Sequence, residues 1–132
     1  MTGIGGDSLV LIVEDNDKNL KLTRDVLQFH GFRTVEAMTG EEGLAMAREH
    51  SPDLILMDIA LPGIDGVEAT RQLKAEDATA SIPVVALTAS VMRADRARFE
   101  ASGFVGVIAK PIDVLTFPEQ VLAYLRAAQP QP

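Results

Sequence analysis

The stretch LILMDIALPG, Leu54–Gly63, leads four apolar residues directly into the carboxylate of Asp58. The apolar run is too short for a typical helix and does not alternate with polar residues, so it predicts a strand buried on both faces. Removing an ionised carboxylate from water is costly unless the group is paired or binds a metal. Asp58 therefore either marks a strand end at the surface or has a chemical role.

Three further apolar runs each predict a strand with both faces buried. They cover Leu9–Val13, Ile82–Leu87 and Phe104–Ala109. A weaker run, FRTVEAM from Phe32 to Met38, alternates apolar with polar residues. It suits a strand nearer the edge of a sheet.

Segments with helical spacing lie between these runs. They cover Asn16–His30, the stretch from Thr39 to Ser51, Asp65–Ala75, Ala89–Ser102 and the stretch from Thr116 to about Arg126. Thr39 with Glu42 has the spacing of a capping box, which starts a helix. Five alternations of strand and helix predict right-handed crossovers and an α/β fold with one open, doubly wound, five-stranded parallel sheet.

Length and composition indicate a single globular domain. The chain has 132 residues, of which 47% are apolar and 23% charged, and no apolar run approaches the roughly 20 residues of a membrane span. The N-terminal residues MTGIGGDS lack the features of a signal peptide, and the absence of cysteine agrees with a reducing, cytoplasmic environment. We expect residues 1–7 and 128–132 to be flexible tails around a domain over residues 8–127.

The net charge of the chain limits its partners. A value of −7 argues against binding to a nucleic-acid backbone, because proteins that do so carry a basic surface. We therefore expect no direct nucleic-acid binding, and the lack of a long apolar run predicts no membrane association.

Polar residues follow four of the predicted strands at the point where each strand ends. Glu14 and Asp15 follow the first, Asp58 the third, Thr88 the fourth and Lys110 the fifth. The carboxyl ends of parallel strands lie along one edge of such a sheet, and these folds bind ligands at that edge. Three carboxylates, a hydroxyl and an ammonium are therefore expected to converge on one cleft.

Three carboxylates so close together repel one another, and one lysine does not neutralise them. With oxygen ligands alone the natural cation is Mg²⁺, which carboxylates, water and phosphate oxygens hold together. At such a site Asp58 can act as a nucleophile towards phosphorus, while Lys110 and the metal offset charge on the transferred group. Taken singly, each residue has a simpler explanation, such as helix capping for Glu14 and Asp15. All five at one sheet edge would require five coincidences.

The motifs VLIVEDNDKN, PDLILMDIALPGIDG, IPVVALTA and AKP stand in the order and spacing of one family. Over essentially its whole length the chain resembles the CheY-like receiver domain of two-component response regulators. Among receivers it is most similar to stand-alone ones of the DivK type and to those attached to hybrid kinases. The resemblance implies a flavodoxin/CheY-like (βα)5 fold in a single domain. It also implies a signalling protein that is no enzyme beyond self-phosphorylation from small donors and autodephosphorylation.

The resemblance assigns a phosphoacceptor and a metal site to matching residues. Asp58 would accept the phosphoryl group. Asp15 would bind Mg²⁺ directly, and Glu14 would bind it mainly through water. Asp58 itself and the backbone carbonyl of Ala60 would be further ligands, and Mn²⁺ is expected to substitute for Mg²⁺.

The resemblance also assigns a switch, and there the chain departs from the family. Thr88 would be the switch hydroxyl and Lys110 the partner of the phosphate. The Lys110–Pro111 peptide bond is expected to be cis. Receivers usually carry an aromatic switch residue three positions before the lysine, but here that position is Val107. Phe104 lies six positions before the lysine and Tyr124 far downstream, and neither is expected to replace it. The usual coupling of threonine to an aromatic side chain is therefore in question.

These observations predict a single-domain response regulator. It would accept a phosphoryl group on Asp58 from a histidine kinase or histidine phosphotransferase in a Mg²⁺-dependent reaction, and would signal through altered protein contacts. One alternative is a pseudo-receiver that docks partners without phosphorylation. The other is an enzyme, but phosphatases with an aspartate nucleophile resemble a D-x-D pattern, and position 60 is alanine. A flavin carrier would need a phosphate-binding loop after the first strand, where EDND would repel FMN phosphate.

Overall fold

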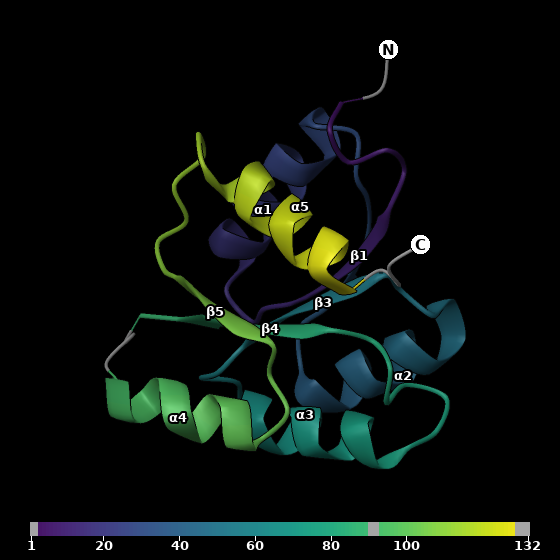
Figure 1. Ribbon diagram of the computed structural model, residues 1–132, viewed down its shortest axis with the longest axis vertical. Coiled ribbons are helices and arrows are strands. Elements are labelled where there is room, and N and C mark those ends of the chain that lie inside the picture. The colour runs from purple at the N-terminus through teal and green to yellow at the C-terminus, as the bar shows by residue number, and fades with distance from the viewer. Residues whose placement is uncertain (1–2, 90–92, 129–132) are drawn as a thin grey trace.

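The computed structural model describes residues 3–89 and 93–128, which form strands and helices in strict alternation (Figure 1). The strands are β1 (Leu9–Val13), β2 (Arg33–Ala37), β3 (Leu54–Asp58), β4 (Val84–Thr88) and β5 (Gly106–Ala109). The helices are α1 (Asp17–Phe29), α2 (Gly40–His50), α3 (Gly66–Ala75), α4 (Arg93–Ala101) and α5 (Phe117–Ala128). All strand pairs are parallel, in the order β2-β1-β3-β4-β5, which confirms the predicted doubly wound sheet.

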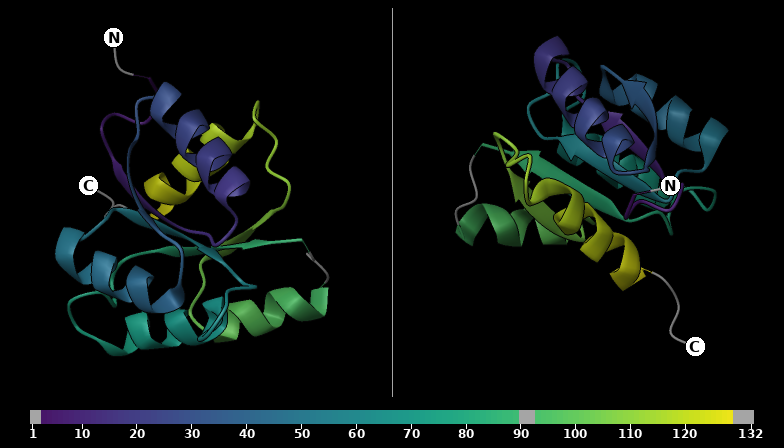
Figure 2. Two further views of the ribbon diagram at one scale, coloured as in Figure 1. Left: turned by 180° about the vertical axis from the view of Figure 1, so that it is seen from behind. Right: turned by 90° about the horizontal axis from the view of Figure 1, so that it is seen from above.

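Helices cover both faces of the sheet. Figures 1 and 2 show α1 and α5 on one face and α2, α3 and α4 on the other. Successive side chains of β3 alternate between the two faces: Leu56 belongs to the core under α1 and α5, whereas Ile55 and Met57 belong to the core under α2, α3 and α4. All residues of β3 and β4 are buried, so the prediction of two covered faces is confirmed for these strands. Asp58 thus ends a strand that lies in the middle of the sheet.

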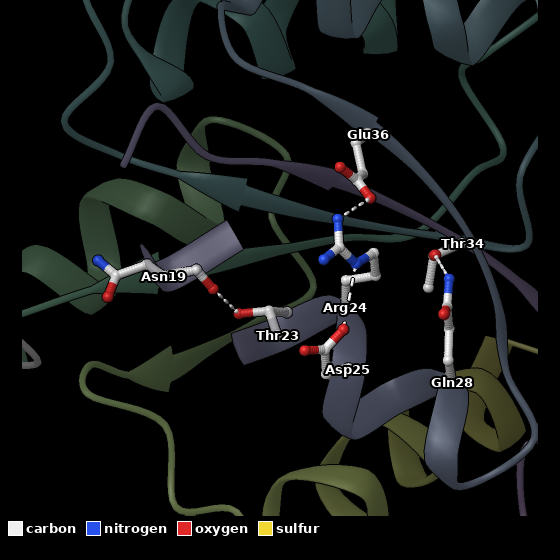
Figure 3. A network of polar contacts seen from close by, with 7 residues as sticks. All are labelled: Asn19, Thr23, Arg24, Asp25, Gln28, Thr34 and Glu36. Atoms are coloured by element: carbon white, nitrogen blue, oxygen red, sulfur yellow. Dashed lines mark hydrogen bonds and ion pairs between the residues drawn. The ribbon is translucent and has the colours of Figure 1, made fainter. Parts of the chain in front are cut away.

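The edge strand β2 shows why its sequence alternates. Val35 packs against the core under α2, α3 and α4, while the side chains of Thr34 and Glu36 meet α1 (Figure 3). Arg24 Nη1 of α1 lies 3.3 Å from Glu36 Oε2, and Gln28 Nε2 donates to Thr34 Oγ1 at 2.8 Å. The polar residues of the weaker run are therefore satisfied by a helix rather than by solvent alone.

The last strand, β5, differs from the prediction. The run Phe104–Ala109 was expected to be buried on both faces, but only Gly106–Ala109 is a strand, and Ala109 is exposed. The reason is its position, because β5 ends the sheet and pairs with β4 alone. Phe104 lies before the strand and packs edge to face on Phe99 of α4. An uninterrupted apolar run therefore did not distinguish a central strand from this edge strand.

Polar side chains start the helices where the sequence predicts. Thr39 Oγ1 accepts a hydrogen bond from the Glu42 N–H at 3.0 Å. Asn16 and Asp65 cap α1 and α3 in the same way. The first part of the helix predicted after the fourth strand, residues 90–92, lies outside the described residues. In the described part of the chain no helix is long and apolar enough to cross a membrane.

Residues 3–7 and the end of α5 lie outside the elements predicted from the sequence but belong to the folded structure. Within the segment expected as an N-terminal tail, Gly5 is buried and its N–H donates to the His30 carbonyl at 2.8 Å. The Asp7 N–H donates to the Gly31 carbonyl at 3.0 Å. At the other end α5 continues to Ala128, beyond the predicted end near Arg126. Residues 3–7 are therefore bound to the turn after α1.

Candidate functional site

Two carboxylates with different surroundings follow β1. The Glu14 N–H donates to the Ala37 carbonyl at 3.0 Å, which continues the pairing with β2 and fixes the backbone at this point. The Glu14 side chain is buried, and its Oε2 accepts from the Asn16 N–H at 3.3 Å. Asp15, the next residue, is exposed. The pair therefore presents one enclosed carboxylate and one that solvent reaches.

Asp58 is the last residue of β3 and is 3% exposed. Its Oδ1 accepts a hydrogen bond from the Ala60 N–H at 3.1 Å. The chain then folds back on itself, because the Gly66 N–H at the start of α3 donates to the Ile59 carbonyl at 3.1 Å. A Cβ atom at Gly66 would overlap the carbonyl oxygen of Asp58. Glycine at this position therefore allows α3 to begin against the end of β3, which encloses Asp58.

Lys110, directly after β5, joins the two buried carboxylates. Its Nζ lies 2.9 Å from Glu14 Oε1 and 3.3 Å from Asp58 Oδ2. Its backbone N–H donates to the carbonyl of Thr88, the last residue of β4, at 2.9 Å. The Lys110–Pro111 peptide bond is cis, the isomer expected from the sequence. The ends of β1, β3, β4 and β5 thus meet at one place.

Carboxylate oxygens of Glu14, Asp15 and Asp58 all lie within 4.8 Å of one another, and we call these three residues the acidic cluster. The cluster offers only oxygen atoms, which suits a hard cation such as Mg²⁺. When all groups are ionised, Lys110 offsets one of its three negative charges, and a divalent cation would offset the other two. Because Asp15 is exposed, a cation can reach the acidic cluster from solvent. The residues present therefore fit a magnesium ion.

Burial shifts the ionisation of the acidic cluster. Desolvation, followed by the hydrogen bond with Asp58, raises the pKa of Glu14 from its ordinary 4.5 to about 7. Burial also acts to raise the pKa of Asp58, but the hydrogen bonds with Glu14 and with the Ala60 N–H and the charge of Lys110 outweigh it, so that pKa lies below its ordinary value. Without a metal, Glu14 is therefore the group that holds a proton, and Asp58 is the ionised carboxylate.

We expect the metal-free protein to lose stability as the pH rises from about 4.5 to about 7, because over this range folded Glu14 keeps a proton that the unfolded chain releases. Stability falls with pH wherever the folded state binds more protons, and the loss from this group is about 3 kcal/mol. Asp58, with its lowered pKa, acts only in a more acidic range. Urea unfolding in a chelator at several pH values would measure the loss against Glu14→Gln, whose amide does not titrate. Equal pH dependence in the two proteins would contradict the prediction.

The remaining predicted residues are Thr88, Ala60 and Val107. Thr88 is 8% exposed at the end of β4, and Ala60 stands beside Asp58 through its N–H. Val107 is half buried and packs against the core under α2, α3 and α4. Val107 is therefore an ordinary packing residue at the position where the resemblance led us to look for an aromatic side chain.

A hollow of about 290 Å³ beside Lys110 was not predicted from the sequence. Leu22 and Thr23 of α1 form one side, and Pro111 and Ile112 form the other. Leu22 is 41% exposed and does not share the buried face of α1. An apolar residue on the polar side of that helix is the sequence signal that points to this hollow.

The strand order, the acidic cluster and its bridging lysine are those of a receiver domain. Residues 10–122 match the family described as the response regulator receiver domain, and the chain belongs to that family. It is 47% identical over 116 residues to the polar-differentiation response regulator DivK of Brucella anthropi, an alignment that covers 88% of this chain and 94% of the relative. DivK of Brucella abortus shows the same identity and coverage.

Solved structures of similar proteins agree with this assignment. The receiver domain of the sensor histidine kinase PA1611 from Pseudomonas aeruginosa has a TM-score of 0.82 at 29% identity, covering 90% of this chain and 98% of that one. That structure contains a magnesium ion coordinated in its active-site cleft. The chemotaxis protein CheY4 of Vibrio cholerae has a TM-score of 0.81 at 25% identity, covering 92% and 98% of the two chains. The chain is thus a CheY-like protein of two-component signalling.

Proposed function

We propose that this chain is a single-domain response regulator that receives a phosphoryl group on Asp58 from a histidine kinase or histidine phosphotransferase. A carboxylate oxygen of Asp58 forms the new P–O bond while the P–N bond to the donor histidine breaks, and the imidazole keeps the electron pair of that bond. The observation that carries the proposal is the contact of Lys110 with both buried carboxylates at the point where the acidic cluster meets solvent.

The ionisation states of Asp58 and Lys110 support the assignment of Asp58 as the nucleophile. The pKa of Asp58 lies below its ordinary value, so this carboxylate is ionised and ready to attack. Lys110, whose pKa is raised by its contacts with Glu14 and Asp58 against the opposing effect of burial, is a permanent cation at neutral pH. Lys110 would offset charge on the transferred phosphoryl oxygens, and Thr88, at the end of neighbouring β4, would donate its hydroxyl to them.

The metal proposal assigns a part to each oxygen donor. Asp15 and Asp58 would bind Mg²⁺ directly with the Ala60 carbonyl, and Glu14 would act mainly through water. The bound ion would supply positive charge to the phosphoryl oxygens, and the same nearby charge would favour loss of the proton from Glu14. Mn²⁺ has the same preference for oxygen ligands and is expected to substitute.

The hollow beside Lys110 supports a protein as the phosphoryl donor. A donor histidine that reaches Asp58 brings its own protein over the rim of the site, where Leu22 and Ile112 line the hollow. Burying such apolar surface stabilises a complex. We propose a cytoplasmic setting for this exchange, with signalling through further protein contacts and without direct contact to nucleic acid.

The proposal is tested by supplying a small phosphodonor. With acetyl phosphate and Mg²⁺ the chain is expected to gain the mass of one phosphoryl group, measured by intact-protein mass spectrometry. With a chelator in place of Mg²⁺ the gain is expected to vanish, and Mn²⁺ is expected to restore it. An unchanged mass in the presence of Mg²⁺ would sink the proposal.

A second candidate function is a pseudo-receiver that binds partners without phosphorylation. Val107 favours it, because the strand lacks the aromatic side chain that usually accompanies a receiver's switch. A pull-down from lysate separates the two functions by comparing the chain with and without beryllofluoride and Mg²⁺. Phosphorylation-dependent signalling predicts two different sets of partners, whereas the pseudo-receiver predicts identical ones.

A further inference from the structure

A hollow of about 280 Å³ runs along the outer side of β5, between α4 and α5. Arg96 and Glu100 of α4, Val105 and Val107 at the strand and Tyr124 of α5 contribute to its walls. β5 pairs with β4 alone, so its other edge is not paired with a strand of the sheet (Figure 1). Gly106 and Val107 of this strand line the hollow. The hollow lies apart from the acidic cluster and is lined by a different set of side chains.

The ring of Tyr124 rests directly on Gly106, the first residue of β5. A Cβ atom at Gly106 would overlap Oη, Cε1 and Cζ of the tyrosine, so the ring fills the space that a strand side chain would take. Val107 points to the opposite face of the sheet and packs under α4, whereas Tyr124 belongs to the core under α5. The ring that covers Gly106 therefore comes from α5 and not from the strand.

A short connection links this ring to the phosphoacceptor site. β5 has four residues, with Gly106 at one end and Ala109, the neighbour of Lys110, at the other. Lys110 contacts Asp58 through its Nζ and donates its N–H to Thr88. The Lys110 backbone is thus joined through this one short strand to Gly106, the residue on which the ring rests.

We propose that Tyr124 is a positioning residue of the switch: seated on Gly106, its ring stabilises the unphosphorylated arrangement of β5, and phosphorylation of Asp58 displaces it toward solvent. The proposal rests on the proposed function, because it needs a phosphoryl group at Asp58. If the two positions are coupled, the coupling is reciprocal, and any change that unseats the ring must tighten binding at Asp58.

The chain provides its own reporter for this displacement, because Tyr124 is its single tyrosine and it has no tryptophan. Beryllofluoride with Mg²⁺ serves as the phosphoryl probe, and ¹⁹F NMR measures its occupancy independently of the tyrosine. We expect acrylamide quenching of tyrosine emission to rise about twofold when the probe is bound. Occupancy with unchanged quenching would overturn this inference and leave phosphorylation intact, while a lack of occupancy would overturn the proposed function and the inference together.

Variants of the contact test the reciprocal effect. Tyr124→Leu removes the ring and Gly106→Ala displaces it, so each is expected to bind beryllofluoride about fivefold more tightly, near the lower end of typical couplings. Tyr124→Phe keeps the ring and is expected to bind within about twofold of the wild type. Leu122→Ala is the matched control, since Leu122 is partly buried against the same core on the same helix. Affinities that are unchanged in both ring variants, or raised equally in Leu122→Ala, would refute the coupling.

Discussion

The variant Asp58→Asn is expected to take up no phosphoryl group from acetyl phosphate and Mg²⁺ under conditions that phosphorylate the wild type. The amide has the shape of the carboxylate but lacks the anionic oxygen that attacks phosphorus. The fold is expected to persist, because Lys110 keeps its 2.9 Å contact with Glu14 and the substitution removes one of three clustered negative charges. Intact-protein mass spectrometry measures the uptake directly.

Two controls make this result specific to the site. Asp77→Asn removes an exposed carboxylate outside the acidic cluster and is expected to leave phosphorylation unchanged. Circular dichroism of Asp58→Asn checks that the variant is folded. A folded Asp58→Asn chain that still gains one phosphoryl group would show that another residue is the acceptor, and it would remove the central claim of the proposed function.

Phe117→Ala is expected to cause the largest loss of stability, about 3–5 kcal/mol, the range for truncating a buried phenylalanine. Phe117 is fully buried at the start of α5, in the core that this helix shares with Leu20 and Leu27 of α1 and Leu87 of β4. The truncation leaves a cavity between the helices and the sheet, which well-packed neighbours fill only in part. A loss of this size lowers the melting temperature by roughly 10 °C or more in a domain of this length.

Phe29→Ala is the matched control for this truncation, since Phe29 is 82% exposed at the end of α1. Its removal is expected to change the free energy of unfolding by less than about 0.5 kcal/mol. Urea unfolding of both variants beside the wild type measures the two losses. Similar losses in both variants would mean that α5 does not complete the core at Phe117 as described.

Much of the fold could be predicted because local patterns report directly on single elements. The apolar runs around Leu56 and Val85 identify strands covered on both faces, and Thr39 identifies the start of a helix through a bond that spans only three residues. The convergence of Asp58 with Lys110 also followed from the sequence, because parallel strands carry their carboxyl ends to one edge.

Other features could not be predicted because they depend on neighbours that are distant in sequence. The run ending at Ala109 has the composition of a central strand, yet β5 lies at the edge of the sheet. The residues of the run carry no information on how many strands pair with it. Tyr124 was not expected to serve the switch because eighteen positions separate it from Gly106, but the packing of α5 on β5 places its ring there. Sequence distance therefore concealed the aromatic ring that covers Gly106.

The sequence by itself determined the alternating elements, the order of the polar residues at the strand ends and the oxygen-only character of the acidic cluster, because each depends on residue type and local spacing. Only the tertiary structure decided that Glu14 is enclosed while adjacent Asp15 is exposed, that burial raises the pKa of Glu14 to about 7, and that a hollow opens beside Lys110. Solvent exclusion and contacts between separate helices cause these differences, and both arise only when the elements pack together.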